Sequence, residues 1–509
     1  MRKKLLDFMQ RRFCLLWCMV FLFLLSPVLV VSANATQYYV GDGSDGALTI
    51  SSTRTEDSVK SNITALASSG QKNVSINSAS GFSAGDWIFI IQIKGSGAGN
   101  YEFTKIDSIT SDTLTLKGNL TNTYQSTGAQ VLKVKQYSSV TVDDGGVWTA
   151  SAWNGTVGGV LVSMISGNVK LKNNGSITMT GKGYRGGNGI FNGTGYQGES
   201  SNGDGTQNTS ANGQGGGGGS VYPGSVTPRG GGGGGGGYGT SGSNGSVSTK
   251  VAASDGVGTG GTGGGTYGTV NLENLLFGGG GGGPSNSNYL PVDTGGNGGG
   301  AIVLVVGGNI TLGGSFSVKG NDGNNGQSGM DGAGGAGGSI RLICSNTVSL
   351  GNGIVVATGG AGLTNTVNYN AKGGDGGVGR IATLSSSTVL GTSNPTIDTS
   401  STDTTITTAP FATTTPPTVS TGTAANITSN SATLNGTVNA NSLSTTAWFN
   451  YGVTSCSYTG TSTTQSVSGS SNSTVSASIS GLSSNTTYYY RTAASNSAGT
   501  SYGSEASFT

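Results

Sequence analysis

Residues 298–320 read GGGAIVLVVGGNITLGGSFSVKG, three short aliphatic stretches separated by pairs of glycine. Apolar side chains alternate along each stretch, which places them on one face of a β-strand. Shorter copies begin near residues 158, 337 and 379. Ile302, Ile340 and Ile381 occupy the same place in three copies, which step by 38 and then 41 residues. A repeat of this length indicates a solenoid of stacked coils.

The repeats predict an all-β fold whose middle region is a parallel β-helix. Its strands alternate apolar and polar or small residues, so the apolar set should point inward. Glycine pairs between the strands are expected to supply the positive φ angles that turn each corner. The side chains predicted to stack inside are Ile302, Leu304, Val306, Ile340, Leu342 and Ile381.

The first 35 residues resemble a secretory signal peptide. Five basic residues precede and border an apolar run from Phe13 to Val31, and Ala33-Asn34-Ala35 offers a cleavage site. The alternative is an uncleaved membrane anchor, because the apolar run approaches a spanning length. After removal the chain would hold 19 basic and 21 acidic residues. This balance gives no reason to expect a nucleic-acid partner, and no membrane contact is expected beyond the signal segment.

The remaining chain divides by composition into four parts. Residues 36–142 contain hairpin-like strands and predict a small antiparallel β-barrel or roll that caps the solenoid. Residues 143–392 form the glycine-rich solenoid, with an insert at 183–298. Residues 393–416 are mostly Thr, Ser, Ala and Pro and read as a linker, and residues 417–509 as a β-sandwich.

The insert at 183–298 has two interpretations. It is either a flexible excursion, because ordering glycine costs much backbone entropy, or a packed array of extended polyglycine helices with three residues per turn. Tyrosines recur through it and either stack on sugar rings or pin the loops to the fold. These tyrosines are Tyr184, Tyr196, Tyr222, Tyr238, Tyr267 and Tyr289.

Residues 482–499 read LSSNTTYYYRTAASNSAG and resemble the fibronectin type III signature. Leu482 and Tyr488 stand at the spacing of its tyrosine corner, with Ala494, Asn496 and Gly499 in register. Ser484 replaces the usual proline. The resemblance implies a β-sandwich in which the Tyr488 hydroxyl bonds back to the chain. The glycine-rich layout is more loosely similar to secreted bacterial glycine-rich proteins.

Histidine is absent, which excludes Ser-His-Asp and Cys-His catalysis and histidine zinc sites. Asp143 and Asp144 are adjacent but precede two glycines, so a turn explains them better than a glycosidase pair. Asp322 and Asp331 have a calcium-repeat spacing without its aliphatic residue, and the segment holding Asp42 and Asp45 lacks a closing glutamate. No catalytic or cofactor-binding residue is therefore predicted, calcium is only weakly indicated, and metal binding stays open.

The sequence favours a secreted or cell-surface protein with a structural or adhesive role and no catalytic activity. Polysaccharides or other surface ligands are its expected partners. The alternative is a polysaccharide-active β-helix enzyme, a hydrolase or lyase, with a fibronectin type III accessory domain. Outside the signal segment only Cys344 and Cys456 remain, in different predicted domains, so no disulfide is expected.

Overall fold

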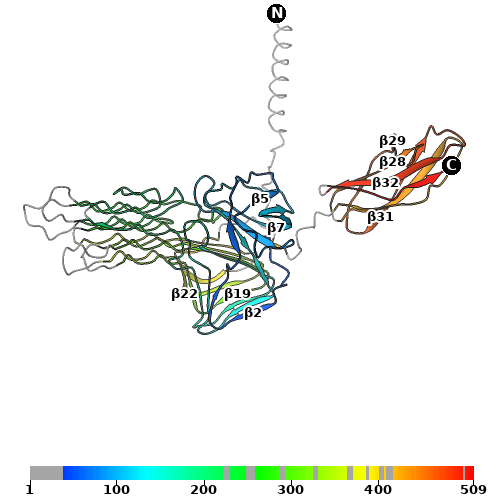
Figure 1. The fold of residues 1–509 in the computed structure, drawn as a ribbon. Helices are drawn as coiled ribbons and strands as arrows, with labels where there is room; N and C mark the ends of the chain where they lie inside the picture. The colour runs from blue at the N-terminus through cyan, green and yellow to red at the C-terminus, as the bar shows by residue number, and fades with distance from the viewer. Residues whose placement is uncertain are drawn as a thin grey trace, which may run out of the picture. The chain divides into compact units, whose positions relative to one another are not determined.

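A computed structural model provides the fold. It describes residues 38–191, 193–221, 230–247, 258–286, 293–324, 331–363, 371–385, 389–399, 406–407, 416–441, 443–496 and 499–509. The predicted signal segment 1–35 and most of the predicted linker lie outside these residues. All regular structure in the described part is β (Figure 1). None of the described residues belongs to a helix long and apolar enough to cross a membrane.

One face of the solenoid is a parallel five-stranded sheet in the order β10-β13-β18-β21-β23. Its strands pair without slippage, so Ile302 lies opposite Ile340, and Ile340 opposite Ile381. The predicted repeat slot is thus a physical stack. We call this sheet the first face, and its strands are β10 (Lys135–Tyr137), β13 (Val160–Ile165), β18 (Ala301–Val306), β21 (Ser339–Cys344) and β23 (Arg380–Ser385).

The other two faces of the solenoid are also parallel, and the long strand β22 (Val348–Val356) joins them. Each coil adds one strand to each face, as the repeat pattern requires. The second face contains β2 (Ala47–Ile50), β11 (Ser139–Val142), β14 (Val169–Leu171) and β19 (Ile310–Leu312). The third contains β3 (Thr53–Thr55), β12 (Val147–Thr149), β15 (Ser176–Thr178) and β20 (Ser315–Ser317), and β24 (Val389–Asn394) pairs with β22.

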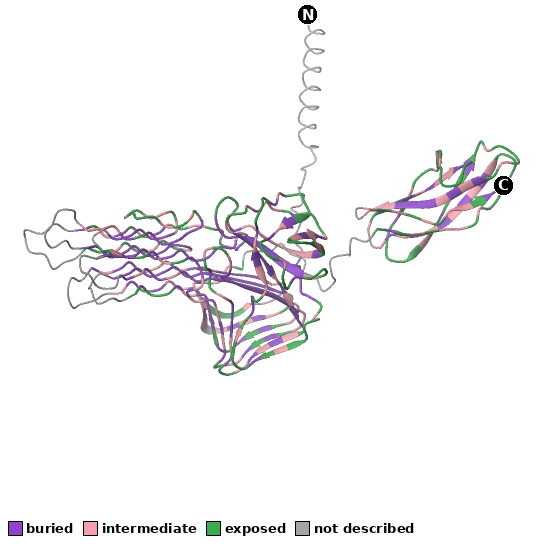
Figure 2. Ribbon diagram, in the orientation of Figure 1, coloured by how far each residue is buried: buried purple, intermediate pink, exposed green. Residues whose placement is uncertain are grey.

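The interior of the solenoid is one apolar column. Every side chain predicted to stack inside belongs to it, and each is at most 2% exposed. Phe316 and Val318 of the same repeat copy join them from the third face. The inward assignment made from the alternating pattern is therefore confirmed by the packing. Figure 2 shows the buried residues of the solenoid strands in purple.

The outer side of the first face is buried as well, which the alternating pattern did not predict. Val303 and Val305 point away from the column and are fully buried. They share a second apolar cluster with Trp87 and Phe89 of the amino-terminal unit. A sheet covered on both sides needs apolar residues at every position, which explains the unbroken sequence AIVLVV of β18.

The amino-terminal unit is an antiparallel sheet with its own core. A bridge between Ile63 and Ile76 joins its two edges, in agreement with a small barrel or roll. It is narrower than residues 36–142, because β2, β3, β11 and β12 belong to solenoid coils. It also packs on the first face rather than over a solenoid end. Its strands are β4 (Lys60–Asn62), β5 (Asn73–Ser75), β6 (Trp87–Gln92), β7 (Tyr101–Thr110), β8 (Thr113–Leu116) and β9 (Ala129–Lys133).

The glycine pairs at the corners serve a purpose different from the predicted one. Gly307 and Gly308, between β18 and β19, do not have positive φ angles. A Cβ atom on Gly308 would lie 2.6 Å from the carbonyl carbon of Gly167 in the preceding coil. These corners therefore need glycine because neighbouring coils approach closely, and the expectation of positive φ there was wrong. Gly351 has a φ of 66°, so at this corner the prediction of a positive φ is correct.

Residues 416–509, the C-terminal unit, form two antiparallel sheets around one core. The chain alternates between the sheets, and inward residues of both, such as Leu434 and Phe449, pack together. One sheet holds β26 (Thr418–Thr421), β27 (Ser431–Asn439) and β31 (Asn472–Ser480). The other holds β28 (Thr445–Gly452), β29 (Gly460–Thr461), β30 (Gln465–Val467), β32 (Tyr488–Asn496), β33 (Gly499–Tyr502) and β34 (Ala506–Phe508).

Tyr488→Phe should lower the free energy of unfolding of the C-terminal unit by about 1 kcal/mol. The Tyr488 ring packs on Phe508, and its hydroxyl accepts a 3.0 Å hydrogen bond from the Ser483 amide. The matched control is Tyr489→Phe, because the Tyr489 hydroxyl makes no hydrogen bond to the described residues and should contribute little. Urea unfolding curves would measure both, and equal stability of Tyr488→Phe and wild type would contradict this role.

The two cysteines outside the predicted signal segment should react very differently with a thiol reagent. Cys344 is fully buried and burial raises the pKa of its thiol, whereas Cys456 is exposed; neither is in a disulfide. In protein without residues 1–35, Cys456 should react in the folded state and Cys344 only after denaturation. Mass spectrometry of the labelled peptides would show this, and a Cys344–Cys456 cross-link would refute it.

Candidate functional site

The glycine-rich segments of the described residues are packed side by side rather than left loose (Figure 1). They come from the insert and also from the matching corners of later coils, between the third and first faces. We call them the glycine array, and its segments are residues 183–189, 195–199, 215–220, 231–237, 242–246, 259–265, 278–283, 295–300, 320–323, 332–338, 359–362 and 373–379.

The segment 231–237 shows how the array is built. Its backbone amides donate in turn to three neighbours, and the pattern repeats every three residues. Amides 231, 234 and 237 bond the segment 214–220, amides 232 and 235 bond 243–246, and amides 233 and 236 bond 331–334. A period of three is that of the extended left-handed polyproline II helix, in which the three directions are about 120° apart.

The carbonyl groups of the same segment point to three further neighbours. They accept from amides in segments 261–264, 279–282 and 374–377. Six neighbours surround segment 231–237, and its backbone is satisfied without a β-sheet ladder. The array is therefore a hexagonally packed bundle of polyglycine helices. Of the two sequence interpretations, the described residues follow the packed one.

Glycine is required here because a side chain would collide with the next segment. A Cβ atom on Gly235 would lie 2.0 Å from the carbonyl oxygen of Asp375, and one on Gly280 would lie 2.0 Å from that of Arg185. Neither glycine has a positive φ. Segment 332–338 has room for a methyl group on one side only. Ala333 and Ala336, which are three residues apart and fully buried, occupy that side.

Outer segments of the array carry hydroxyl and amide side chains that accept hydrogen bonds from neighbouring backbone amides. Ser246 Oγ accepts from the Lys372 amide at 2.7 Å, and Thr240 Oγ1 accepts from the Val378 amide at 3.0 Å. Asn244 Oδ1 accepts from the Gly263 amide at 2.8 Å. These side-chain oxygens accept hydrogen bonds from backbone amides at the edge of the array. Without them, those amides would have to bond to water.

Three of the insert tyrosines lie at the base of the array, where it meets the first face. The hydroxyl of Tyr184 donates to the carbonyl of Ile93, and that of Tyr267 to the carbonyl of Phe277. Tyr238 is 2.7 Å from the Ser339 hydroxyl, and its ring lies 4.5 Å from that of Tyr267. These tyrosines pin the array to the fold. Tyr196 is 36% exposed, and Tyr222 and Tyr289 lie outside the described residues.

A charged network that the sequence did not point to also anchors the base. Lys94 of the amino-terminal unit lies 2.9 Å from both Glu199 and Asp204, and Arg185 lies 3.0 Å from both. Trp153 of the solenoid donates to Glu199 at 3.1 Å. The hydrogen bond from Lys94, with both nearby cations, lowers the pKa of Asp204. Two cations and two anions balance, so this network is a structural clamp, and its members are too far apart in sequence to form a motif.

The opposite end of the array is held together by contacts between the ends of its described segments. Val221 forms a bridge with Gly230, and Gly231 with Val247. The Asn324 amide donates to Thr294, and the Asp331 amide to Ala371. We call this end the array tip, and it consists of Val221, Gly230, Val247, Gly258, Asn286, Asp293, Asn324, Asp331, Leu363 and Ala371.

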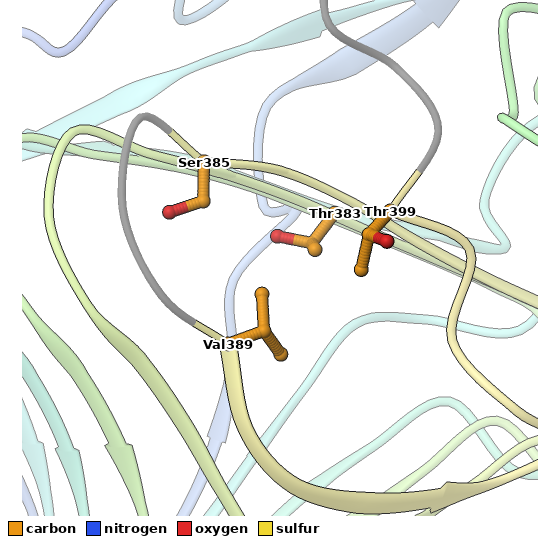
Figure 3. A pocket seen from close by; sticks show the side chains of 4 residues that line it. All are labelled: Thr383, Ser385, Val389 and Thr399. Carbon is orange, nitrogen blue, oxygen red and sulfur yellow. The ribbon is translucent and has the colours of Figure 1, made fainter.

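A cavity of about 330 Å³ lies beside the last coil, lined by Thr383, Ser385, Val389 and Thr399 (Figure 3). The Thr383 hydroxyl donates to the Leu342 carbonyl at 3.2 Å, and the Ser385 hydroxyl to the Asn346 carbonyl at 2.7 Å. Both hydroxyls thus bond the preceding coil. None of the four lining residues is titratable, so they supply neither an acid nor a base.

Most of the acidic residues singled out in the sequence bond backbone amides or lysines. Asp143 pairs with Lys172 at 2.7 Å, and Asp144 accepts from the Asn174 amide. Asp42 Oδ1 accepts from the Ser44 amide at 2.9 Å, and Asp45 pairs with Lys135. Asp322 accepts from the Ala361 amide, and Asp331 is buried in the array. The described residues contain no group of three or more His, Cys, Asp or Glu side chains able to hold a metal.

No protein-family model and no curated protein matches this chain. Among solved structures, the sensor domain of the anti-sigma factor RsgI4 of Pseudobacteroides cellulosolvens is 22% identical over 18% of this chain and 86% of its own, with a TM-score of 0.14. The gp49 tailspike of Pseudomonas phage LKA1 is 12% identical over 86% and 88%, with a TM-score of 0.17. The Gp54 tailspike of Acinetobacter baumannii phage AP22, solved with capsular saccharide, is 11% identical over 91% and 90%, with a TM-score of 0.15. TM-scores this low do not establish a shared fold, so the architecture rests on the strand pairing.

Proposed function

We propose that this is a secreted or cell-surface protein with a structural or adhesive role and no catalytic activity. In this proposal the solenoid is the support, and the glycine array is a stiff outgrowth that holds the array tip away from it. A stiff support lowers the entropy lost on binding. The ligand would be a surface polysaccharide or another surface molecule.

The arrangement of the array tip carries the proposal. The described segments that end there are separated along the chain by residues 222–229, 248–257, 287–292, 325–330 and 364–370, which lie outside the described residues. These separating stretches contain four glycines among 37 residues, whereas segment 231–237 is glycine throughout. They also include Tyr222, Tyr289 and Tyr369. At its tip, a lattice that tolerates almost no side chains thus continues into sequence that is rich in side chains, which is the composition that a binding surface requires.

We also infer that the C-terminal unit is a fibronectin type III domain serving as a spacer or binding module. Two antiparallel sheets around one core are in keeping with this. The hydrogen bond between the Ser483 amide and the Tyr488 hydroxyl is also in keeping with a fibronectin type III domain, and so is the packing of Leu482 against the core. These are the features that the resemblance at residues 482–499 implies.

A glycan-array screen that also measures released reducing ends tests the proposal. Wild type is compared with a tip variant in which residues 222–229 and 364–370 are replaced by Gly-Ser sequences of equal length. We expect wild type to bind a set of glycans without releasing products, and the tip variant to lose members of that set at unchanged melting temperature. Unchanged binding by the tip variant would overturn the adhesive role, and product release would overturn the non-catalytic role.

A further inference from the structure

The C-terminal unit brings its only two charges together. Among residues 417–509, Arg491 is the only basic residue and Glu505 the only acidic one. The Tyr458 ring contacts both, stacking on Arg491 and hydrogen-bonding Glu505 through its hydroxyl. In a unit otherwise built from neutral residues, two charges meeting at one place indicate a site, and this scarcity is also the sequence signal that could have revealed it.

Arg491 is held between two aromatic rings. Its guanidinium carbon lies 3.9 Å from the centre of the Tyr502 ring and 4.7 Å from that of Tyr458. Within the described parts of the chain it forms no hydrogen bond or ion pair, and its Nε atom is buried without a partner. The planar donor group is thus fixed in orientation while its donors stay unused. A fixed guanidinium fork matches the two oxygens of a carboxylate.

Glu505 does not neutralise Arg491 by direct contact. Its oxygens accept hydrogen bonds from the Ser455 hydroxyl at 2.6 Å, the Cys456 amide at 2.7 Å and the Tyr458 hydroxyl at 2.6 Å. Burial and the Glu505 carboxylate raise the pKa of Tyr458 to about 12, so this hydroxyl stays protonated at neutral pH. Glu505 therefore acts as a positioning residue that holds Tyr458 against the guanidinium.

The surroundings of Arg491 are polar and aromatic. Asn450 lies directly opposite Arg491 on β28, and Trp448 lies opposite Ala493. Tyr502 of the edge strand β33 flanks Ala493 on the other side and is 50% exposed. Ala493 itself is fully covered, although it belongs to this outer face. Aromatic faces with amide groups beside them suit the apolar faces and hydroxyls of sugar rings.

We propose that the surface formed by Trp448, Asn450, Tyr458, Arg491 and Tyr502 binds an acidic saccharide, with the Arg491 guanidinium holding the sugar carboxylate. The positive charge selects an anion, and the fork geometry selects a carboxylate. Several aromatic side chains at one place favour a sugar ring, whose apolar face stacks on them, over an extended peptide. The site goes beyond the proposed function and does not depend on the array tip.

Isothermal titration of the full chain with three acidic oligosaccharides tests the proposal. The probes are trigalacturonate, trimannuronate and sialyllactose, each paired with its carboxyl methyl ester, and a peptide of three glutamates represents the protein alternative. Wild type should bind at least one acid with a Kd below about 1 mM and its methyl ester at least tenfold more weakly. Arg491→Gln should weaken binding of the acid at least tenfold, and Arg491→Lys should restore only part of it.

Two controls show whether binding of the acid depends on the Arg491 surface. Lys172→Gln removes a partly exposed cation of the solenoid, which pairs with Asp143, and should leave the affinity unchanged. The tip variant should also bind the acid normally, so this proposal and the proposed function can fail independently. The proposal is overturned if no acid binds, if the methyl ester binds equally well, if Arg491→Gln binds like wild type, or if only the glutamate peptide binds. Unchanged affinity with lowered stability in Arg491→Gln would make the stacked arginine purely structural.

Discussion

Gly235→Ala is expected to lower the free energy of unfolding by about 3 kcal/mol or more, at or above the upper end of the usual range for overpacking. The new methyl group would lie 2.0 Å from the Asp375 carbonyl oxygen, and the neighbour is backbone that cannot turn aside. Relief requires segments 231–237 and 373–379 to separate, which breaks the hydrogen bonds that link segment 231–237 to its six neighbours. Amide hydrogen exchange should therefore rise sharply in both segments, and urea unfolding should shift to lower concentration.

Gly118→Ala is the matched control for this prediction. Gly118 is exposed, its φ is not positive, and nothing lies within 4 Å of the position that its Cβ would take. The same substitution there should be neutral or stabilise slightly, because it restricts the unfolded chain. If Gly235→Ala and Gly118→Ala had equal stability and equal exchange, the array would not be closely packed.

Leu304→Asp should cost about 3 kcal/mol or more, because an unpaired carboxylate would enter the apolar column. Leu304 is fully buried and lies between Ser163 and Leu342 in the stack of the first face. Neither neighbour could balance the charge. The expected result is a much lower melting temperature, or loss of folded solenoid as seen by circular dichroism.

Thr311→Asp tests whether position, rather than the aspartate itself, causes the effect. Thr311 is exposed on β19 and pairs with Lys170 of β14, a favourable neighbour for an added carboxylate. This variant should melt within a few degrees of wild type. A Leu304→Asp protein that melts like the parent would show that this face of β18 does not point into the column.

The solenoid core could be predicted because its signal is local and repeated. Alternation along residues 302–306 assigns the inward side chains, and recurrence at Ile340 and Ile381 assigns their register. The same residues did not reveal that Val303 and Val305 are covered from the other side. The unbroken apolar run of β18 was the available sign, but the covering residues, Trp87 and Phe89, are more than 200 positions away.

The candidate sites were harder to predict, because their members meet only through folding. Arg491 and Tyr502 are close in sequence, yet Tyr458 reaches the same guanidinium from an earlier part of the chain. At the base of the array, Lys94 meets Glu199 across 105 positions. Neither set has a spacing that a motif search would recognise, since each contact depends on how separate segments pair.

The sequence alone determined the repeat period, the strand alternation and the absence of histidine. The first two predict the β-solenoid, and the third excludes histidine chemistry. The state of the glycine-rich region could not be decided in that way. Taken singly, its segments have no side chains to bury and lose much entropy on ordering. Packed together, each gains hydrogen bonds in up to six directions that exist only when its neighbours are in place. Order in the glycine array is therefore a property of the assembled tertiary structure.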